Sequence, residues 1–255
     1  MDAPLRVGVL GVQVDALSSE DLNGIVETAV RAGRKVVIAH HNLHSIALWH
    51  REPGLRGFCE RADFAHIDGM PIIWWGRLLG HPLQARHRVT YVDWFPLLLG
   101  LAARSDWRVF YLGSARGVAE RGAELMRARF PGLQIYTRHG FFHAVPGSAE
   151  NTAVLEEIRL VRPHILMVGM GMPRQERWIV QHLDCLEANV ILPAGACMDY
   201  FAGTAPVPPR WLGRVGLEWA YRLVREPQRL GWRYLVEPWS LLPAAWRDLR
   251  RRCGR

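Results

Sequence analysis

Residues 164–178 read HILMVGMGMPRQERW, and this stretch decides the fold class. An uninterrupted apolar run is followed by a glycine turn and then by a polar segment that opens near Pro173. A proline at this place suits the first turn of a helix, where its missing N–H costs nothing. Buried strand, turn and helix in this order predict a unit of a parallel sheet.

The same order recurs on both sides of this stretch. Helical patterns such as SEDLNGIVETAVRAG (residues 19–33) separate most of the apolar runs. Because strands alternate with helices, we predict an α/β, Rossmann-like, mainly parallel sheet with helices on both faces, spanning residues 1–205. The expected strands are RVGVLGVQV, which would be the first strand, KVVIAH, FAHID, RVFYLGS, LQIYTRHG, HILMVGM and NVILPAG.

A different pattern begins after FAGTAPVPPRW (residues 201–211), where three prolines end the alternation. Residues 206–255 are predicted to form a helical basic appendage, with 11 arginines against 4 acidic residues, or +7 of the net charge of +8. Arg222, Arg225, Arg229 and Arg233 fall at helical spacing, although Pro227 must kink that helix. The appendage also holds five tryptophans. Arginine with tryptophan suits a lipid headgroup layer, although each tryptophan taken singly is expected to pack against the body.

Composition excludes several classes of protein. No apolar stretch reaches the roughly 18 residues of a membrane-spanning helix, and the start lacks the pattern of a signal peptide. We therefore expect a cytoplasmic protein, attached peripherally to the inner face of the cytoplasmic membrane through the appendage. Four dispersed cysteines predict neither a disulfide framework nor a zinc knuckle. His40 and His44 lack a third ligand nearby, so no metal site is expected.

Candidate site residues fall at strand ends, where ligands of open α/β sheets bind. Glycine turns after two strands favour phosphate, and the helix after the second turn would present polar side chains in its first turn. A further strand end delivers a histidine and an asparagine. On spacing alone, the turn at 168–178 is read equally well as a plain βα turn. The residues concerned are Gly113, Gly169, Gly171, Gln175, Glu176, His40 and Asn42.

Asp68 follows the strand FAHI and precedes the apolar segment MPIIWW, with Gly69 expected to allow a sharp turn between them. An acid beside a large apolar surface is partly desolvated, which raises its pKa and strengthens it as a base. Asp93 and Asp199 are rival carboxylates that composition alone does not separate from Asp68. The tryptophans that follow, at positions 74 and 75, either pack their helix onto the body or face an acceptor.

Several motifs together resemble the WecG/TagA/CpsF family of bacterial glycosyltransferases, over roughly residues 36–236. The resemblance implies a metal-independent, inverting transfer of a hexose from a UDP-sugar to a sugar on undecaprenyl diphosphate, in surface polysaccharide synthesis. It implies no cofactor beyond the UDP-sugar co-substrate. The motifs are DGMPIIWWGRLLG, HRVTYVDW, YLGSARGVAE, VGMGMPRQERWI, GACMDYFAGTAPVPPRW and GLEWAYRLVREPQRLGWRYL.

The resemblance also assigns roles. It makes Asp68 the catalytic base. His40 and Asn42, which a strand end delivers into the crevice, are expected to assist it, and the acceptor or sugar side is expected at Arg88, Asp93 and Asp199. At His40 the family commonly has threonine, and HHN with VTYVDW favours glucose over N-acetylmannosamine as the donor sugar. The residues that match the nucleotide and diphosphate motifs are Gly169, Gly171, Gln175, Arg222, Arg229 and Arg233.

Two other classes of function remain open on the sequence. Arginine with aromatic residues also suits a nucleic-acid backbone, so a basic nucleic-acid-binding protein is the main alternative, although the glycine-turn crevice argues against nucleic acid as partner. A dinucleotide enzyme is a weaker alternative, because no GxGxxG follows the first strand. We also expect the chain to be able to form a homo-oligomer.

Overall fold

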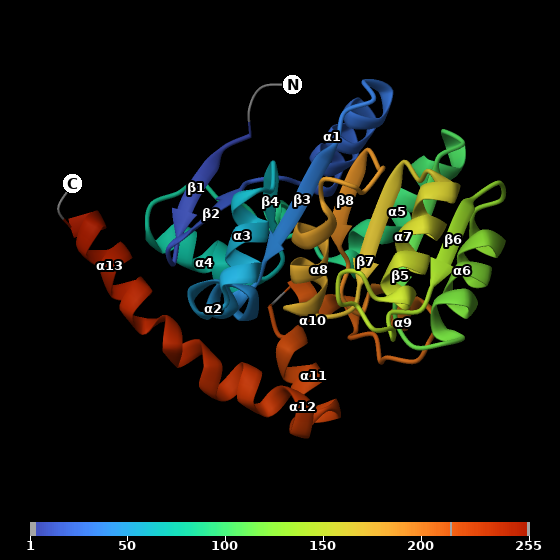
Figure 1. Cartoon of the computed structure of the whole chain (residues 1–255). Helices are drawn as coiled ribbons and strands as arrows, with labels where there is room; N and C mark the ends of the chain where they lie inside the picture. The colour runs from blue at the N-terminus through green and yellow to red at the C-terminus, as the bar shows by residue number, and fades with distance from the viewer. Residues whose placement is uncertain (1–3, 215, 254–255) are drawn as a thin grey trace.

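The fold is built on one six-stranded sheet, seen in a computed structural model that describes residues 4–214 and 216–253 (Figure 1). The strands are all parallel and lie in the order β4-β3-β8-β7-β5-β6. The predicted α/β class with a mainly parallel sheet is therefore confirmed. The strands of this sheet are β3 (Val36–His41), β4 (Phe64–Ile67), β5 (Arg108–Gly113), β6 (Gln134–Arg138), β7 (Ile165–Gly169) and β8 (Val190–Pro193).

Helices cover both faces of the sheet, as the alternation predicted. Successive residues of a strand point to opposite faces, so Val109 and Tyr111 of β5 lie in one core and Phe110 and Leu112 in the other. The first core packs against α1 (Ser19–Arg31), α5 (Tyr91–Arg104), α6 (Val118–Arg129) and α9 (Cys197–Phe201). The second packs against α3 (Pro53–Glu60), α7 (Ala149–Val161) and α8 (Arg174–His182).

The opening run is not a strand of this sheet, and that prediction was wrong. It forms an antiparallel hairpin of β1 (Arg6–Val9) and β2 (Val12–Asp15). Leu10 and Gly11 both have positive φ, 51° and 88°, which is the backbone of a tight hairpin turn. The hairpin packs on α2 (Leu43–Arg51) and α4 (Met70–Leu78) around a third apolar cluster, and a short 3₁₀ turn, η1 (Ala85–His87), follows α4.

The C-terminal segment crosses the carboxyl ends of the strands and then runs along the hairpin side of the body (Figure 1). Its helix breaks at Pro227, as predicted, because α11 ends at Arg225 and α12 begins at the proline. Leu241 and Ala244 are buried against the hairpin cluster. The elements are α10 (Arg210–Arg214), α11 (Glu218–Arg225), α12 (Pro227–Gly231), the π turn η2 (Trp232–Val236), the 3₁₀ turn η3 (Glu237–Leu241) and α13 (Leu242–Cys253).

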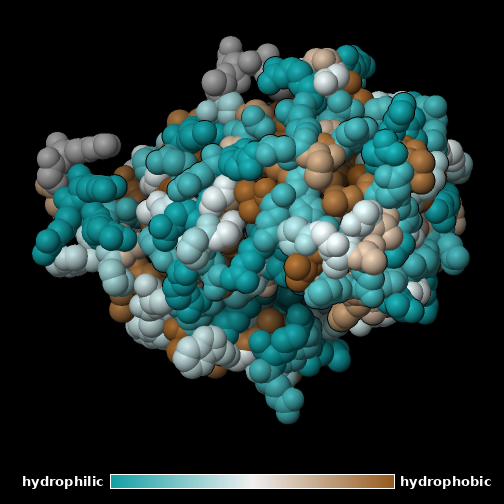
Figure 2. All heavy atoms as spheres, viewed as in Figure 1, coloured by the Kyte–Doolittle hydropathy of each residue, from teal (hydrophilic) through white to brown (hydrophobic). Residues whose placement is uncertain are grey.

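The tryptophans of the appendage are exposed, which corrects the expectation that each packs against the body. Trp232, Trp239 and Trp246 are 67%, 67% and 58% exposed. The surface along this segment is a mixture of pale and apolar residues with charged ones (Figure 2). Within the described part of the chain, no helix combines the length and the apolar character needed to cross a bilayer.

Candidate active site

Two adjoining cavities open at the carboxyl ends of the strands, beneath the appendage. The first, of about 390 Å³, we call the apolar cavity, because Met70, Pro71, Ile72, Trp219 and Pro238 are in its wall. The second, of about 290 Å³, we call the glycine cavity, because the turns at Gly171 and Gly195 line it. Their shared wall consists of Asn42, His44, Asp68, Thr90, Glu218, Arg222 and Arg233.

Asp68 lies in this shared wall, directly after β4. Its backbone N–H donates to the carbonyl of His41 at 2.8 Å, which ties the end of β4 to the end of β3. Burial raises the pKa of the Asp68 carboxyl to about 6, and this rise is limited by the hydrogen bond from Asn42 and by nearby arginines. A carboxylate with such a pKa is ionised at neutral pH and is still a stronger base than an exposed aspartate.

Asn42 orients this carboxylate. Its amide Nδ2 donates to Oδ2 of Asp68 at 3.2 Å, while its Oδ1 accepts from the N–H of Ser45 at 3.0 Å. The second bond is the N-terminal cap of α2, so the sequence that starts this helix also fixes the direction of the amide. The pairing of Asn42 with Asp68 was expected only as proximity, and it is a direct contact.

Gly69 does not have the conformation expected for a sharp glycine turn. Its φ is 162°, which is extended backbone open to any residue, and an added Cβ would meet its nearest atoms only at 3.8 Å. The turn into α4 therefore has no local need for glycine. Pro71, early in α4, is at a favoured position for proline in a helix.

His40 lines the glycine cavity but not the apolar one. Burial, reinforced by the charge of Arg233, lowers its pKa to about 4. Its imidazole is therefore neutral at pH 7, which excludes a role as a charged acid there. Its ring centroid lies 5.6 Å from that of Tyr91 and 5.6 Å from that of His66, so it belongs to a buried aromatic cluster under the site.

Gln175 holds the two turns of the glycine cavity together. Its Oε1 accepts from the backbone N–H of Gly171 and from that of Gly195, each at 3.1 Å. These glycines follow β7 and β8, and Gly171 has a φ of 80° that side chains other than glycine rarely adopt. The amide thereby fixes the shape of the backbone that faces a ligand.

Three residues expected on the nucleotide side lie outside both cavity walls. A Cβ on Gly113 would fall 2.3 Å from the carbonyl oxygen of Gly169, and one on Gly169 would fall 2.2 Å from the hydroxyl of Tyr111. Both glycines are therefore required by the close packing of strand ends, and their place on the nucleotide side stays a prediction. Glu176 is also buried away from the cavities, where burial raises its pKa to about 7 and Gln175 donates to it at 2.7 Å.

The arginines of the appendage converge on the cavities. Arg222 and Arg233 lie in the shared wall, and Arg229 lines the glycine cavity. Burial lowers the pKa of Arg233, whereas for Arg222 the pull of Tyr200, Tyr234 and Asp68 outweighs burial and raises the pKa. Both remain charged at neutral pH. Three successive appendage elements, α11, α12 and η2, thus place cations at the cavities that Asp68 lines.

The rival carboxylates have other surroundings. Oδ2 of Asp199 accepts from the hydroxyl of Ser114 at 2.8 Å, and Oδ2 of Asp93 accepts from that of Thr90 at 3.0 Å. Neither Asp93 nor Asp199 lines the apolar cavity or the glycine cavity. Arg88 does line the apolar cavity, where it pairs with Glu218 of the appendage and lies 4.0 Å from Asp93. The geometry therefore favours Asp68 among the three.

The structure also brings in residues that the sequence reasoning missed. Glu237 of the appendage contacts His44 and Arg51 on α2, although it is almost 200 positions away along the chain. Trp75 donates from Nε1 to Asp248 of α13 at 3.0 Å, so it packs under the appendage, whereas Trp74 is 46% exposed. No local sequence pattern predicts these pairs. The available signal was that acidic residues such as Glu237 and Asp248 are rare in the basic appendage.

No cluster of three or more histidine, cysteine or acidic side chains suited to a metal ion occurs in residues 4–214 and 216–253. His44, one half of the pair considered for metal, instead contacts Glu237.

Comparison with known proteins identifies the family of this chain. A family model described as the glycosyl transferase WecG/TagA/CpsF family matches residues 7–254. Among similar proteins is the N-acetylglucosaminyldiphosphoundecaprenol N-acetyl-beta-D-mannosaminyltransferase of Staphylococcus aureus strain MW2, which is 25% identical over 230 residues, covering 89% of this chain and 87% of the relative. The proteins of the same name from strains NCTC 8325 / PS 47 and MRSA252 match over the same shares at the same identity. The resemblance seen in the motifs is confirmed, and the chain belongs to the WecG/TagA/CpsF family of glycosyltransferases.

Proposed function

We propose that this glycosyltransferase moves a hexose, with inversion, from a UDP-sugar in the glycine cavity to a polyprenyl-diphosphate-linked sugar in the apolar cavity. The observation that carries the proposal is the place of Asp68, whose carboxylate lies in the wall that the two cavities share. A base at such a junction can reach a hydroxyl on one side while a sugar is presented from the other.

The glycine cavity suits the donor. Arg222, Arg229 and Arg233 bring three charges to its wall, beside the glycine turns whose shape Gln175 holds. A UDP leaving group carries a diphosphate whose charge must be stabilised as the bond to the sugar breaks. We propose that these arginines do this without a metal ion and that no further cofactor takes part.

The apolar cavity suits the acceptor. It combines an apolar wall at Met70, Pro71 and Ile72 with Arg88 and the two shared arginines, which matches a sugar diphosphate carried on a lipid. The acceptor hydroxyl would attack the anomeric carbon opposite UDP, and Asp68 would take its proton. The new glycosidic bond forms as the bond to UDP breaks, and UDP leaves as the anion.

We propose that the appendage attaches the protein to the inner face of the cytoplasmic membrane. Its inner side is held to the body at Glu237, Leu241 and Asp248, while Trp232, Trp239 and Trp246 point outward. Tryptophan and arginine on one outer surface favour the boundary between headgroups and acyl chains. A lipid-linked acceptor would then reach the apolar cavity from the side on which the protein is anchored.

The relatives from Staphylococcus aureus are named for transfer of N-acetylmannosamine to N-acetylglucosaminyldiphosphoundecaprenol. At 25% identity and with His40 beside the donor cavity, we retain both N-acetylmannosamine and glucose as donor sugars. The test is a thermal-shift screen of UDP-hexoses, followed by UDP release with a short-chain lipid diphosphate that carries N-acetylglucosamine. Acceptor-dependent UDP release from one of these donors supports the proposal; binding of DNA at physiological salt with no affinity for UDP-sugars contradicts it.

A further inference from the structure

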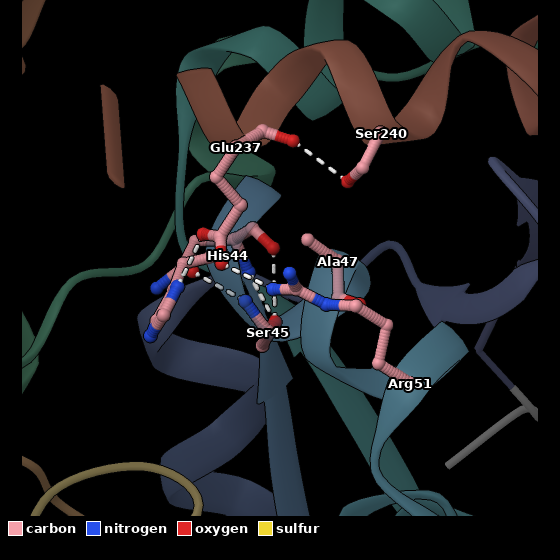
Figure 3. Close-up of polar contacts among 7 residues, drawn as sticks. His44, Ser45, Ala47, Arg51, Glu237 and Ser240 are labelled. Carbon is pink, nitrogen blue, oxygen red and sulfur yellow. Dashed lines mark hydrogen bonds and ion pairs between the residues drawn. The ribbon is translucent and has the colours of Figure 1, made fainter. Parts of the chain in front are cut away.

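A buried carboxylate joins the appendage to the body beside the site (Figure 3). Glu237, only 5% exposed, begins η3 and reaches α2, where Oε2 contacts Nδ1 of His44 and Oε1 accepts from Arg51 at 2.5 Å. Both carboxylate oxygens are therefore used. We call this set of three residues the Glu237 clasp.

The carboxylate of the clasp is ionised at neutral pH. Burial alone would raise the pKa of Glu237, but the hydrogen bonds and charges of His44 and Arg51 outweigh it and the pKa is lowered. An ionised carboxylate gives stronger and more directional hydrogen bonds than a neutral one. The clasp thus fixes the start of η3 on α2.

The segment that the clasp fixes also carries the arginines of the cavities. Arg233 lies four residues before Glu237 and Arg229 lies eight before it, within the helical run from α12 through η3. The Nε of Arg233 is buried and has no hydrogen-bond partner among the described residues, and its guanidinium carbon lies 5.8 Å from the ring centroid of Tyr234, the next residue of η2. The place of Arg233 near Asp68 therefore follows the backbone of η2, which carries both side chains.

The body side of the clasp is linked to the same site. His44 lies two residues after Asn42, the residue that caps α2 and donates to Asp68. His44 also lines both cavities, so the side chain that contacts Glu237 faces the ligand space as well. The N-terminal end of α2 thus contacts the Asp68 carboxylate through Asn42 and the appendage segment after Arg233 through His44.

A second anchor of the appendage is independent of this site. Oδ2 of Asp248 accepts from the N–H of Leu10 at 2.6 Å and from Nε1 of Trp75 at 3.0 Å. It holds α13 to the hairpin and to α4, eleven residues beyond Glu237. Asp248 therefore provides a matched control: a buried acid of the appendage that holds no arginine of the site.

We propose that Glu237 is a positioning residue, which through His44 and Arg51 holds Arg233 over Asp68 and so couples docking of the appendage to assembly of the diphosphate site. The inference rests on the proposed function, because it takes the cavity beside Arg233 to bind the UDP diphosphate. The arrangement of the cations around Asp68 then depends on the Glu237 clasp itself, and the presence of the appendage alone is not enough.

The test is a double-mutant cycle with Glu237→Gln and Arg233→Gln in the full chain, with UDP affinity measured by calorimetry and kcat and KM by UDP release. Charged hydrogen bonds of this kind are worth about tenfold to a hundredfold in an equilibrium constant, so Glu237→Gln should weaken UDP binding by that factor. Because Glu237 acts through Arg233, the double variant should bind UDP within about twofold of Arg233→Gln alone.

The control is Asp248→Asn, whose effect should multiply with that of Arg233→Gln. Hydrogen exchange of residues 227–236, which needs no ligand, should rise in Glu237→Gln and stay unchanged in Asp248→Asn. If Glu237→Gln does not fold, Arg51→Gln removes one arm of the clasp from a half-exposed position and should show the same pattern.

Two results would overturn the inference: independent, multiplying effects of Glu237→Gln and Arg233→Gln, or unchanged exchange at residues 227–236. Failure of the proposed function gives a different result, since the wild-type chain itself would then neither bind UDP nor release it. The exchange measurement reports on the clasp in either case.

Discussion

Replacing Asp68 by asparagine should abolish most catalysis while leaving the fold and UDP binding intact. The change keeps the size of the side chain and an oxygen that can accept from Asn42, and it removes the negative charge together with the ability to accept a proton. With a pKa of about 6, the Asp68 carboxyl is about nine-tenths ionised at pH 7, so the wild-type base is almost fully available. Losing a general base costs about a hundredfold to ten-thousandfold in kcat, or about 2.7–5.5 kcal/mol in the barrier.

The same substitution should stabilise the protein, with a defined pH dependence. The native pKa of about 6 lies above the ordinary 3.8, so the fold disfavours the ionised carboxyl. This difference corresponds to about 3 kcal/mol, absent below pH 4 and complete above pH 6. Asp68→Asn should therefore unfold at a higher temperature than wild type at pH 8, with the gain vanishing near pH 4. The value of about 3 kcal/mol already includes the attraction of Asp68 to the nearby arginines.

The assay combines UDP release between pH 5 and 8 with thermal unfolding of the same samples. Wild-type kcat/KM should rise with pH through about 6, as the Asp68 carboxyl ionises. Asp199→Asn is the matched control, because Asp199 is bonded to Ser114 outside both cavities and should keep turnover within a few-fold of wild type. Near-normal turnover of Asp68→Asn, in a folded sample that binds UDP, would refute the assignment of the base.

Three further outcomes follow from the site and the appendage. Arg233→Gln should weaken UDP binding about tenfold to a hundredfold by calorimetry, whereas the exposed Arg251→Gln should leave it unchanged. Alanine at Trp232, Trp239 and Trp246 together should release the protein from anionic vesicles in sedimentation without changing its UDP affinity; equal sedimentation of the variant and the wild type would contradict this. Excess EDTA should leave UDP release unchanged, and a loss that Mg²⁺ restores would contradict the metal-free proposal.

The apolar runs predicted the main sheet well, because its strands other than β6 are buried on both faces and read as short, mainly apolar runs. The edge strand β6 is only partly buried, with Tyr136 exposed. The hairpin was missed because RVGVLGVQV also looks like one strand. Its turn depends on the positive φ of Leu10 and Gly11, and leucine gives little warning of that conformation. The packing role of Gly113 and Gly169 could not be predicted, because a glycine needed for packing looks the same in sequence as one that faces phosphate.

Asp68 was predicted from its position after a strand. It is favoured over Asp93 and Asp199 because it lines both cavities and they line neither, and the cavities exist only in the folded chain. The exposure of the appendage tryptophans could not be predicted either, because tryptophan side chains are commonly buried whereas these are exposed. Glu237 gives no local signal, because its partners lie on a helix near the other end of the chain.

The most direct test of the central claim is the configuration of the product. Wild-type protein is given the UDP-hexose that the donor screen selects and a short-chain lipid diphosphate bearing N-acetylglucosamine, and the anomeric coupling of the new linkage is measured by NMR. The account predicts one UDP released per sugar transferred and a linkage of configuration opposite to that of the donor, both lost in Asp68→Asn. Retention of configuration, or transfer that persists in Asp68→Asn, would contradict a single displacement assisted by Asp68.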